Sequence, residues 1–351
     1  MINKQSIYYW FFFPLLALLS AGSLTSCIYD SVLEEEDTSG KSTLSITMRG
    51  ITTTDPSTTG GNYDDYVKTL RVIGFDASGS VVCNELHEGT DFAIINDALN
   101  ITQTMEDTFQ GGVCDFYFIA NEDWYSVYNN SPGDLSTFLS SISSKSELED
   151  CMLATPKDLE TLGSSPILMT TSVRSTLKPG DNTINNIELV RCFAKAQLLL
   201  KVESEVTKPV STKVSLCVPA PDSFYLLPGK EEVITSTTPL SYYTISGGSQ
   251  PMNTELITSD YFFISEVVYL PERYLSDNTP ENAVKYQITL DNNVYPASIA
   301  DNTTGTPDYN IKRNYAYTTI GTYAPASEAT VTLEWKVKEY TDVSVDVPTF
   351  E

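Results

Sequence analysis

Histidine is almost absent from this sequence, and its scarcity limits the chemistry that the chain can perform. His87 is the single histidine among 351 residues, so a Ser-His-Asp triad, a Cys-His pair or a histidine-ligated zinc site would have to use it. It lies in the polar stretch CNELHEGTD, which predicts a solvent-exposed turn. The chain also lacks a G-x-S-x-G motif, a phosphate loop and a dinucleotide-binding fingerprint.

Acidic residues are plentiful, but no spacing singles out two of the 46 as a catalytic pair. We therefore expect no enzymatic activity and no cofactor. Basic residues are scarce, at 21 Lys and Arg, and the formal net charge is −25. A charge of this sign argues against nucleic acid or an anionic membrane surface as a partner.

Cysteines are few and form no C-x-x-C motif. Five follow Cys27, an odd number: Cys83, Cys114, Cys151, Cys192 and Cys217. One or two disulfides among them are possible in an exported protein. Three of these cysteines sit in apolar strand patterns, which favours small buried side chains instead. The Asp/Asn-rich stretch 291–310 does not match EF-hand spacing, so we interpret it as a loop of turns with no metal site.

Long apolar runs are also missing. The apolar stretch 7–19 is interrupted by Pro14 and falls short of the roughly 20 residues of a membrane-spanning helix. With Lys4 before it and small residues after it, residues 1–26 have the layout of an export signal.

Leu24-Thr25-Ser26-Cys27 resembles the bacterial lipobox. The resemblance implies cleavage before Cys27 and a diacylglycerol on its thiol, which would anchor the chain because each buried methylene contributes ~0.8 kcal/mol. Residues 27–42 are acidic and polar, and they predict a flexible tether.

The rest of the chain is dominated by alternating apolar and polar residues, the pattern of half-buried strands. STLSITMR places Leu44, Ile46 and Met48 on one face, whereas YVKTLRVIGF is apolar on both faces, as a central strand is. Turn signals such as Asp-Pro, Gly-Gly and Pro-Gly-Asp separate the runs. Spacing of this kind predicts a mainly β fold made of antiparallel sandwiches.

One region has helical spacing instead. Leu135, Phe138, Leu139 and Ile142 recur at i, i+3, i+4 and i+7, which predicts an amphipathic helix. A second short helix is expected to start at Ser146, with Glu149 completing a capping box. The first half of the chain is therefore β with a short helical insertion.

The apolar phase changes near the middle of the chain. Ile187 and Leu189 occupy odd positions, whereas Ala194, Ala196 and Leu198 occupy even ones. One strand cannot change face without a bulge or a break. We place a domain boundary here, which gives an N-terminal sandwich at 43–189 and a C-terminal sandwich at 190–351, with a long strand running from one into the other.

The C-terminus is the most regular stretch. Residues 331–337 alternate with apolar side chains at odd positions, and the same phase resumes with Val343, Val345 and Val347 before Pro348. This last segment has the form of an edge or free strand with one apolar face.

Several stretches, in this order, resemble the FimA-type fimbrillins, subunits of the type V pili of Bacteroidetes. They are the lipobox and acidic tether, YVKTLRVIGFDASGSVV, FYFIANE, the Arg-x-x-Ala-Lys strand in LVRCFAKAQLLLKV, the Tyr-x-Pro-Glu segment in VVYLPERYL, the Arg-Asn-x-x-Tyr strand in IKRNYAYTTIGTY, and LEWKVKEYTDVSVDVP. Each motif alone is short, whereas their order covers nearly the whole chain.

The resemblance implies two tandem transthyretin-like β-sandwich domains and an assembly route at the outer membrane and cell surface. The subunit arrives as a lipoprotein, a trypsin-like protease removes its first strand, and a neighbour's tail fills the groove. In this sequence the expected cut lies between Arg49 and Gly50, because Arg49 is the first arginine of the mature chain and precedes the polar, Gly-rich stretch GITTTDPSTTGGN. The displaced strand would carry Leu44, Ile46 and Met48, and the donor strand would carry Val343, Val345 and Val347.

Other fimbrial subunits are therefore the expected partners, with adhesion to host or glycan ligands as a further role. An uncleaved subunit would keep its lipid on Cys27 and anchor the fibre. The alternative class is a glycan-binding surface lipoprotein that uses aromatic platforms. Trp124-Tyr125 and Tyr242-Tyr243 are the candidate pairs, although most aromatic residues of a β protein pack in cores or on edge strands.

Overall fold

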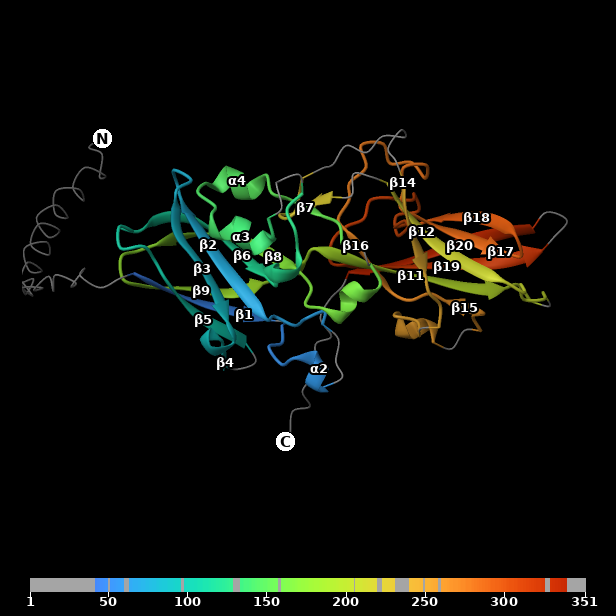
Figure 1. The fold of residues 1–351 in the computed structure, drawn as a ribbon, viewed down its shortest axis with the longest axis horizontal. Helices are drawn as coiled ribbons and strands as arrows, with labels where there is room; N and C mark the ends of the chain where they lie inside the picture. The colour runs from blue at the N-terminus through green and yellow to red at the C-terminus, as the bar shows by residue number, and fades with distance from the viewer. Residues whose placement is uncertain are drawn as a thin grey trace, which may run out of the picture. The chain divides into compact units, whose positions relative to one another are not determined.

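The regular structure is mainly β-strand, gathered into sheets that pack face to face (Figure 1). The structure is a computed structural model. It describes residues 42–49, 51–59, 63–95, 98–128, 133–156, 159–204, 206–219, 223–230, 240–248, 250–257, 260–325 and 329–339. The described residues belong to one compact unit. In the part of the chain that is described, no helix is long and apolar enough to cross a membrane.

Two sheets form the first sandwich, residues 43–191. One has the strand order β4-β5-β1-β9 and the other β10-β8-β6-β2-β3. The strands are β1 (Thr43–Arg49), β2 (Thr69–Asp76), β3 (Val81–Glu88), β4 (Ala93–Ile95), β5 (Ala98–Thr104), β6 (Gly112–Ala120), β8 (Met169–Leu177), β9 (Asp181–Glu188) and β10 (Val190–Arg191). A core cluster drawn from both sheets holds them together.

Two further sheets form the second sandwich, residues 193–339. One has the order β15-β11-β19-β20, with β16 also on β11, and the other β14-β12-β17-β18. The strands are β11 (Phe193–Val202), β12 (Thr212–Pro219), β14 (Leu240–Ile245), β15 (Phe263–Ile264), β16 (Val268–Pro271), β17 (Lys285–Leu290), β18 (Asn293–Ser298), β19 (Tyr315–Pro325) and β20 (Ala329–Glu339). A small sheet pairs β7 (Met152–Ala154) with β13 (Ser223–Tyr225).

Helices cover the outer face of β2 and β6. The chain has α2 (Pro56–Thr59), α3 (Leu135–Ser140), α4 (Lys145–Glu149) and 3-10 turns at Gly89–Asp91, Glu122–Trp124, Thr161–Ser164 and Thr254–Leu256. Leu135 and Leu139 of α3 pack with Ile73 of β2 and Ile119 of β6. The alternate residues of the same strands, such as Val72, face the other core. The prediction that YVKTLRVIGF is a central strand is confirmed, because β2 is buried on both faces.

The predicted second helix begins earlier than expected. Ser144, not Ser146, is its N-cap, and the Ser144 hydroxyl accepts a hydrogen bond from the Glu147 amide. The Glu147 carboxylate accepts one from the Ser143 amide at 3.1 Å. Glu149 instead accepts a hydrogen bond from the Tyr117 hydroxyl at 2.9 Å. The prediction that Ser146 and Glu149 form the capping box was wrong, because the sequence offers two overlapping Ser-x-x-Glu patterns.

The phase change near residue 190 is caused by the breaks between strands after Glu188, whereas a bulge before Ile187 causes an earlier change, from Ile184 to Ile187. Asn186 adopts a left-handed conformation with φ 59°, where the register between β1 and β9 shifts. The chain then leaves β9, pairs with β8 as β10 and enters β11 at Phe193. The single long strand that we expected is therefore divided into three strands, β9, β10 and β11, which pair with different neighbours. The division into tandem domains at 43–189 and 190–351 stays a prediction.

Gly74 of β2 lies at a close approach in the first core. A Cβ at this position would sit 2.8 Å from the Cys83 Sγ and 2.8 Å from an edge carbon of Phe116. We expect Gly74→Ala to lower the free energy of unfolding by about 1–3 kcal/mol, since neither neighbour can retreat from a packed core. Urea denaturation measures the change. Gly89→Ala is the control, because open space surrounds Gly89; equal midpoints for the two variants would contradict the prediction.

Candidate functional site: the seat of the first strand

The strand expected to be displaced lies inside its sheet, not at the edge. β1 runs antiparallel to β5 on one side and parallel to β9 on the other. Leu44, Ile46 and Met48 are 0%, 1% and 0% exposed, and they belong to the first core. The prediction that these three side chains of STLSITMR share one face is therefore confirmed.

We call the surroundings of β1, made by β5, β9 and the core beneath them, its seat. The residues of β5 and β9 that lie opposite Ile46 and Met48 are all apolar. Ile46 lies opposite Ile101 of β5 and Ile184 of β9. Met48 lies opposite Leu99 and Ile187. Ile184 and Ile187 are three residues apart, yet both are buried, because the bulge at Asn186 restores the facing of the second side chain. Below them, the same core cluster includes Val72, Phe116 and Phe118 from the facing sheet.

The residues of β5 and β9 that lie opposite Leu44, in contrast, are polar. Leu44 lies opposite Gln103 of β5 and Asn182 of β9. Gln103 is 1% exposed, and its side chain bonds to His87 at 3.0 Å and to Glu85 at 2.9 Å. Asn182 instead bonds to the backbone of the β8–β9 turn, accepting from the Lys178 amide at 2.9 Å.

The prediction that His87 is exposed in a turn was wrong. It belongs to β3, is 3% exposed, and pairs with Gln103 sixteen residues later. The sequence shows an alternation of Cys83, Glu85 and His87 on one face, but this face carries only one apolar side chain. The partner that satisfies the imidazole lies on another sheet, so no local signal identifies it.

Arg49 is the last residue of β1, and its backbone pairs with Glu188 of β9. Its side chain and Gly50 lie outside the described residues. The chain resumes at Ile51, which packs against the first core. Thr52 then forms a parallel bridge with Tyr66. The predicted cut would therefore fall at the junction between a buried strand and a loop.

The segment after this loop is anchored by Asp64. This carboxylate is 2% exposed, pairs with the Lys195 ammonium and accepts a hydrogen bond from the Tyr269 hydroxyl at 2.8 Å. The Arg191 guanidinium donates to the Asp64 carbonyl at 2.9 Å and pairs with Asp65. The segment after the predicted cut is thus fixed to β10, β11 and β16.

Burial sets the electrostatics of this anchor. Desolvation lowers the pKa of Lys195, against the raising effect of Asp64. Desolvation also raises the pKa of Tyr269, and the Asp64 charge adds to this rise. Sequence reasoning noted the Arg-x-x-Ala-Lys pattern but did not predict that its Arg and Lys converge on Asp64 and Asp65. The acids are more than 120 residues away in sequence, and only the fold brings them together.

The remaining candidate residues divide into two groups. Cys27, Val343, Val345 and Val347 lie outside the described residues. The five other cysteines are buried free thiols, and burial raises the pKa of Cys83 and of Cys151 to about 12. Thiols of this kind are poor nucleophiles. Within the described ranges, no group of three or more His, Cys, Asp or Glu is placed to hold a metal ion.

The candidate aromatic platforms do not form flat exposed pairs. Tyr125 is 2% exposed, and its hydroxyl accepts the Leu168 amide at 3.1 Å. Trp124 is 44% exposed, but the Lys68 ammonium lies 4.7 Å from the centre of its ring. Tyr242 points to solvent, whereas Tyr243 packs against the second core. Neighbouring residues on a strand face opposite ways, so Tyr242 and Tyr243 cannot share one platform.

The Asp64 anchor makes a stability prediction. We expect Lys195→Met to lower the free energy of unfolding by about 3–5 kcal/mol, because it leaves a buried carboxylate without its cation. Lys195→Met with Asp64→Asn should lose less than the single variant, and urea denaturation measures both. Lys230→Met is the control: Lys230 and its partner Asp150 are exposed, so its change should stay within about 1 kcal/mol. Equal losses for Lys195→Met and Lys230→Met would contradict a buried anchor.

Comparison with known proteins finds one family model and several solved structures that resemble this chain. Residues 42–211 match the family model of the major fimbrial subunit protein (FimA). No curated protein matches the sequence. Among solved structures, the chain is similar to the tip fimbrial protein Mfa3 from Porphyromonas gingivalis with a C-terminal truncation. The TM-score is 0.56 at 16% identity, covering 86% of this chain and 100% of that one.

The chain is also similar to a proposed cell adhesion protein from Parabacteroides distasonis, with TM-score 0.53 at 16% identity, covering 87% of this chain and 98% of that one. A proposed cell adhesion protein from Bacteroides eggerthii has TM-score 0.50 at 15% identity, covering 85% of this chain and 97% of that one. At these identities the likeness shows a shared fold, and the predicted mainly β fold class is confirmed. Residues 42–211 thus carry the sequence pattern of the major fimbrial subunit (FimA) family, and the resemblance to the FimA-type fimbrillins is confirmed.

Proposed function

We propose that this chain is a structural subunit of a cell-surface fimbria, exported as a lipoprotein and assembled by strand exchange after proteolytic removal of β1. The observation that carries the proposal is the position of β1. It is the first strand among the described residues, it is buried between two neighbours, and the chain after it is held by separate contacts. A strand with these properties can leave without unravelling the rest of the chain.

Loss of β1 would leave a gap between β5 and β9. Strands lie about 4.8 Å from their neighbours, so the gap has the width of one strand. Its walls would present unpaired N–H and C=O groups, and its floor would expose the first core. An extended segment with an apolar residue at every second position would restore both, by main-chain hydrogen bonds and by side chains. Val343, Val345 and Val347 have this spacing, and burying each would contribute roughly 1.5–3 kcal/mol.

Protease access favours a cut after Arg49. Four of the other arginines are buried, namely Arg71, Arg191, Arg273 and Arg313. Arg71 pairs with Glu122 at 2.7 Å and Arg313 with Glu272 at 2.9 Å. Arg174 has an exposed side chain but lies in the middle of β8, which is paired with β6. Proteases prefer exposed loops to paired strands, and Arg49 borders the polar segment that precedes α2.

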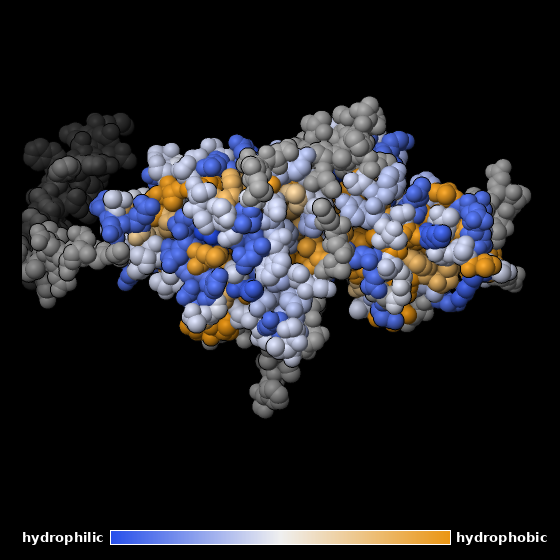
Figure 2. Space-filling model, in the orientation of Figure 1, coloured by the Kyte–Doolittle hydropathy of each residue, from blue (hydrophilic) through white to orange (hydrophobic). Residues whose placement is uncertain are grey.

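The order of the two modifications decides the fate of the subunit. Cys27 precedes Arg49, so a cut after Arg49 would separate the folded part from the lipid. A cut subunit would then be free to join a fibre, whereas an uncut one would stay at the outer membrane as an anchor. The exposed edge of the sheet that contains β1 supports the proposal that subunits contact one another. Ile94 and Ile95 of the edge strand β4 are 54% and 56% exposed and form an apolar patch at the position of β4 (Figure 2).

Arginine-specific proteolysis tests the processing step. We expect the folded chain to be cut once, between Arg49 and Gly50, and sequencing of the new N-terminus measures this. Arg49→Ala should remove the cut, whereas Arg174→Ala should leave it unchanged. A first cut at any other arginine would count against the proposal.

Deletion of residues 342–351 tests the donor segment. After cleavage we expect the full chain to form ladders of stable polymers and the deleted chain to stay monomeric, because the groove then lacks its strand. Native gels and electron microscopy of surface fibres measure both. Val345→Asp is a matched single substitution, since a carboxylate in the groove is costly to bury. Fibres built from the deleted chain would end the donor-strand hypothesis.

A further inference from the structure

We propose that Gln103, with Glu85 and His87, is a clamp that keeps β5 against the facing sheet when β1 leaves, so that the groove keeps its shape until a new strand arrives. This inference rests on the proposed strand exchange. It assigns a positioning role to the polar residues of the first core, which the apolar pattern of the seat does not explain.

The two walls of the seat are held very differently. β9 follows β8 after a turn of three residues, and the Asn182 side chain closes this turn by bonding the Lys178 amide at 2.9 Å and the Lys178 carbonyl at 2.8 Å. β9 is thus tied to β8, a strand of the other sheet, through a short turn that is itself closed by hydrogen bonds. β5 has no such turn, because a longer connection leads from it to β6.

β5 depends on β1 for most of its strand pairing. On its other side β4 pairs only with residues 98–100, so residues 101–104 have β1 as their strand neighbour. The Met105 amide also donates to the Ser42 carbonyl at 2.9 Å, a bond that leaves with β1. Without other contacts, this end of β5 would be free to move away.

Besides core packing, this end of β5 is joined by hydrogen bonds to β3, the edge strand of the facing sheet. The side-chain oxygen Oε1 of Gln103 lies 3.0 Å from the His87 Nε2. The side-chain nitrogen Nε2 of Gln103 donates to the Glu85 carboxylate at 2.9 Å and, within β5, to the Thr104 backbone carbonyl at 2.7 Å. The Glu106 amide donates to the Val82 carbonyl at 3.0 Å. None of these bonds involves β1.

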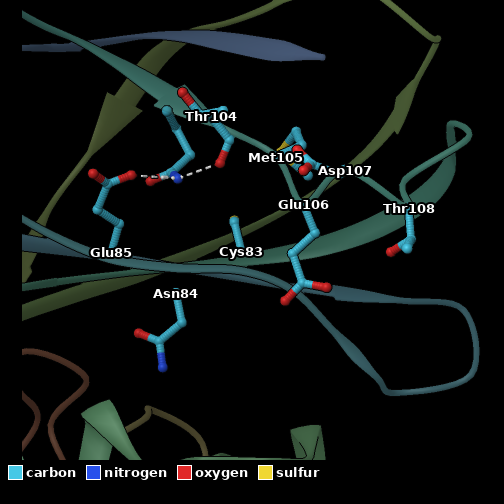
Figure 3. Close-up of a pocket in the computed structure, with 9 residues that line it drawn as sticks. Cys83, Asn84, Glu85, Thr104, Met105, Glu106, Asp107 and Thr108 are labelled. Atoms are coloured by element: carbon cyan, nitrogen blue, oxygen red, sulfur yellow. Dashed lines mark hydrogen bonds between the residues drawn. The ribbon is translucent and has the colours of Figure 1, made fainter. Parts of the chain in front are cut away.

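These hydrogen bonds are costly to break because two of the residues that make them are buried. Gln103 and His87 are 1% and 3% exposed, and a buried polar group that loses its partner is costly. Glu85 stands at the solvent side of the cluster, in a shallow pocket of about 530 Å³. Figure 3 shows Glu85 and Thr104 at the ends of the two dashed bonds, with Cys83 beside them on β3. Separation of β5 from β3 would therefore break a satisfied network and uncover Cys83.

Cys83 provides the measurement. It is 3% exposed, so its reaction with iodoacetamide reports the opening of β5. The experiment uses the full chain carrying Ile46→Asp, which places a carboxylate in the apolar seat and drives β1 out without any protease. Peptide mass spectrometry follows the modification of Cys83, with Cys217 of β12, which is 4% exposed, as the internal reference.

We expect Cys83 in Ile46→Asp to react within about tenfold of its rate in the unchanged chain. Adding Gln103→Met should raise the rate by a further tenfold to about a hundredfold, as loss of buried hydrogen bonds predicts, while Cys217 stays slow. Gln197→Met is the matched control: Gln197 is 0% exposed and makes three comparable bonds in β11, yet its loss should leave Cys83 unchanged. Gln103→Met without Ile46→Asp should leave Cys83 slow, because β1 then still holds β5, whereas a role in packing alone would raise the rate in both backgrounds.

Three results would overturn the clamp. Cys83 in Ile46→Asp alone could react as fast as in urea, which would mean that β5 leaves with β1. Gln103→Met could leave the rate unchanged. Cys83 and Cys217 could become reactive together, which would mean that β1 cannot leave without unfolding the chain. These rates do not depend on cleavage or on residues 342–351, so failure of the clamp and failure of the donor tail are separate results.

Discussion

The fold depends on how deeply its first strand is buried. β1 contributes three fully buried apolar side chains and two sets of strand hydrogen bonds to the first sandwich. A strand in this place cannot be lost without exposing the core beneath it, and the exposed core then favours any segment that can take the same place. In the proposed assembly, stability and strand exchange would therefore be two consequences of one apolar seat.

The contacts around the seat separate the strand that can move from the elements that stay fixed. The chain after β1 is held through Asp64 by Lys195 and Tyr269, which belong to the second sandwich. A second buried group, Arg313, bonds Glu272 at 2.9 Å and the Leu226 carbonyl at 3.2 Å. Buried charges of this kind are costly unless fully partnered, so they fix one arrangement of the elements they join. Buried charged groups thus join the elements on the far side of the predicted cut, whereas β1 is held mainly by side-chain burial and strand pairing.

Sequence patterns predict the parts of this arrangement that depend on neighbours along the chain. Alternation identifies the buried face of β1, both faces of β2 and the helix at Leu135, because each follows from the period of the local structure. The same reasoning fails where a distant partner decides the outcome. His87 looks like a turn residue until Gln103 is placed beside it, and Asp64 looks like a loop acid until the fold brings Lys195 to it. The phase change between Leu189 and Ala194 predicts the break between strands, but it does not predict the bulge at Asn186, which lies before Ile187.

Size and tethering together explain why a cut would be needed before exchange. Leu44, Ile46 and Met48 are larger than the three valines of the tail, so the original strand fills the seat better, by roughly 0.8 kcal/mol for each additional buried methylene. It is also attached to the rest of the chain, and a tethered segment competes at a high effective concentration that a neighbour's tail cannot match. Cleavage after Arg49 would remove the second advantage, because the released strand becomes a dilute peptide once it dissociates. A neighbour's tail could then bind the vacant seat without competing against a strand that is attached to the same chain. In the proposed assembly, cleavage and not a better fit would therefore give the exchange its direction.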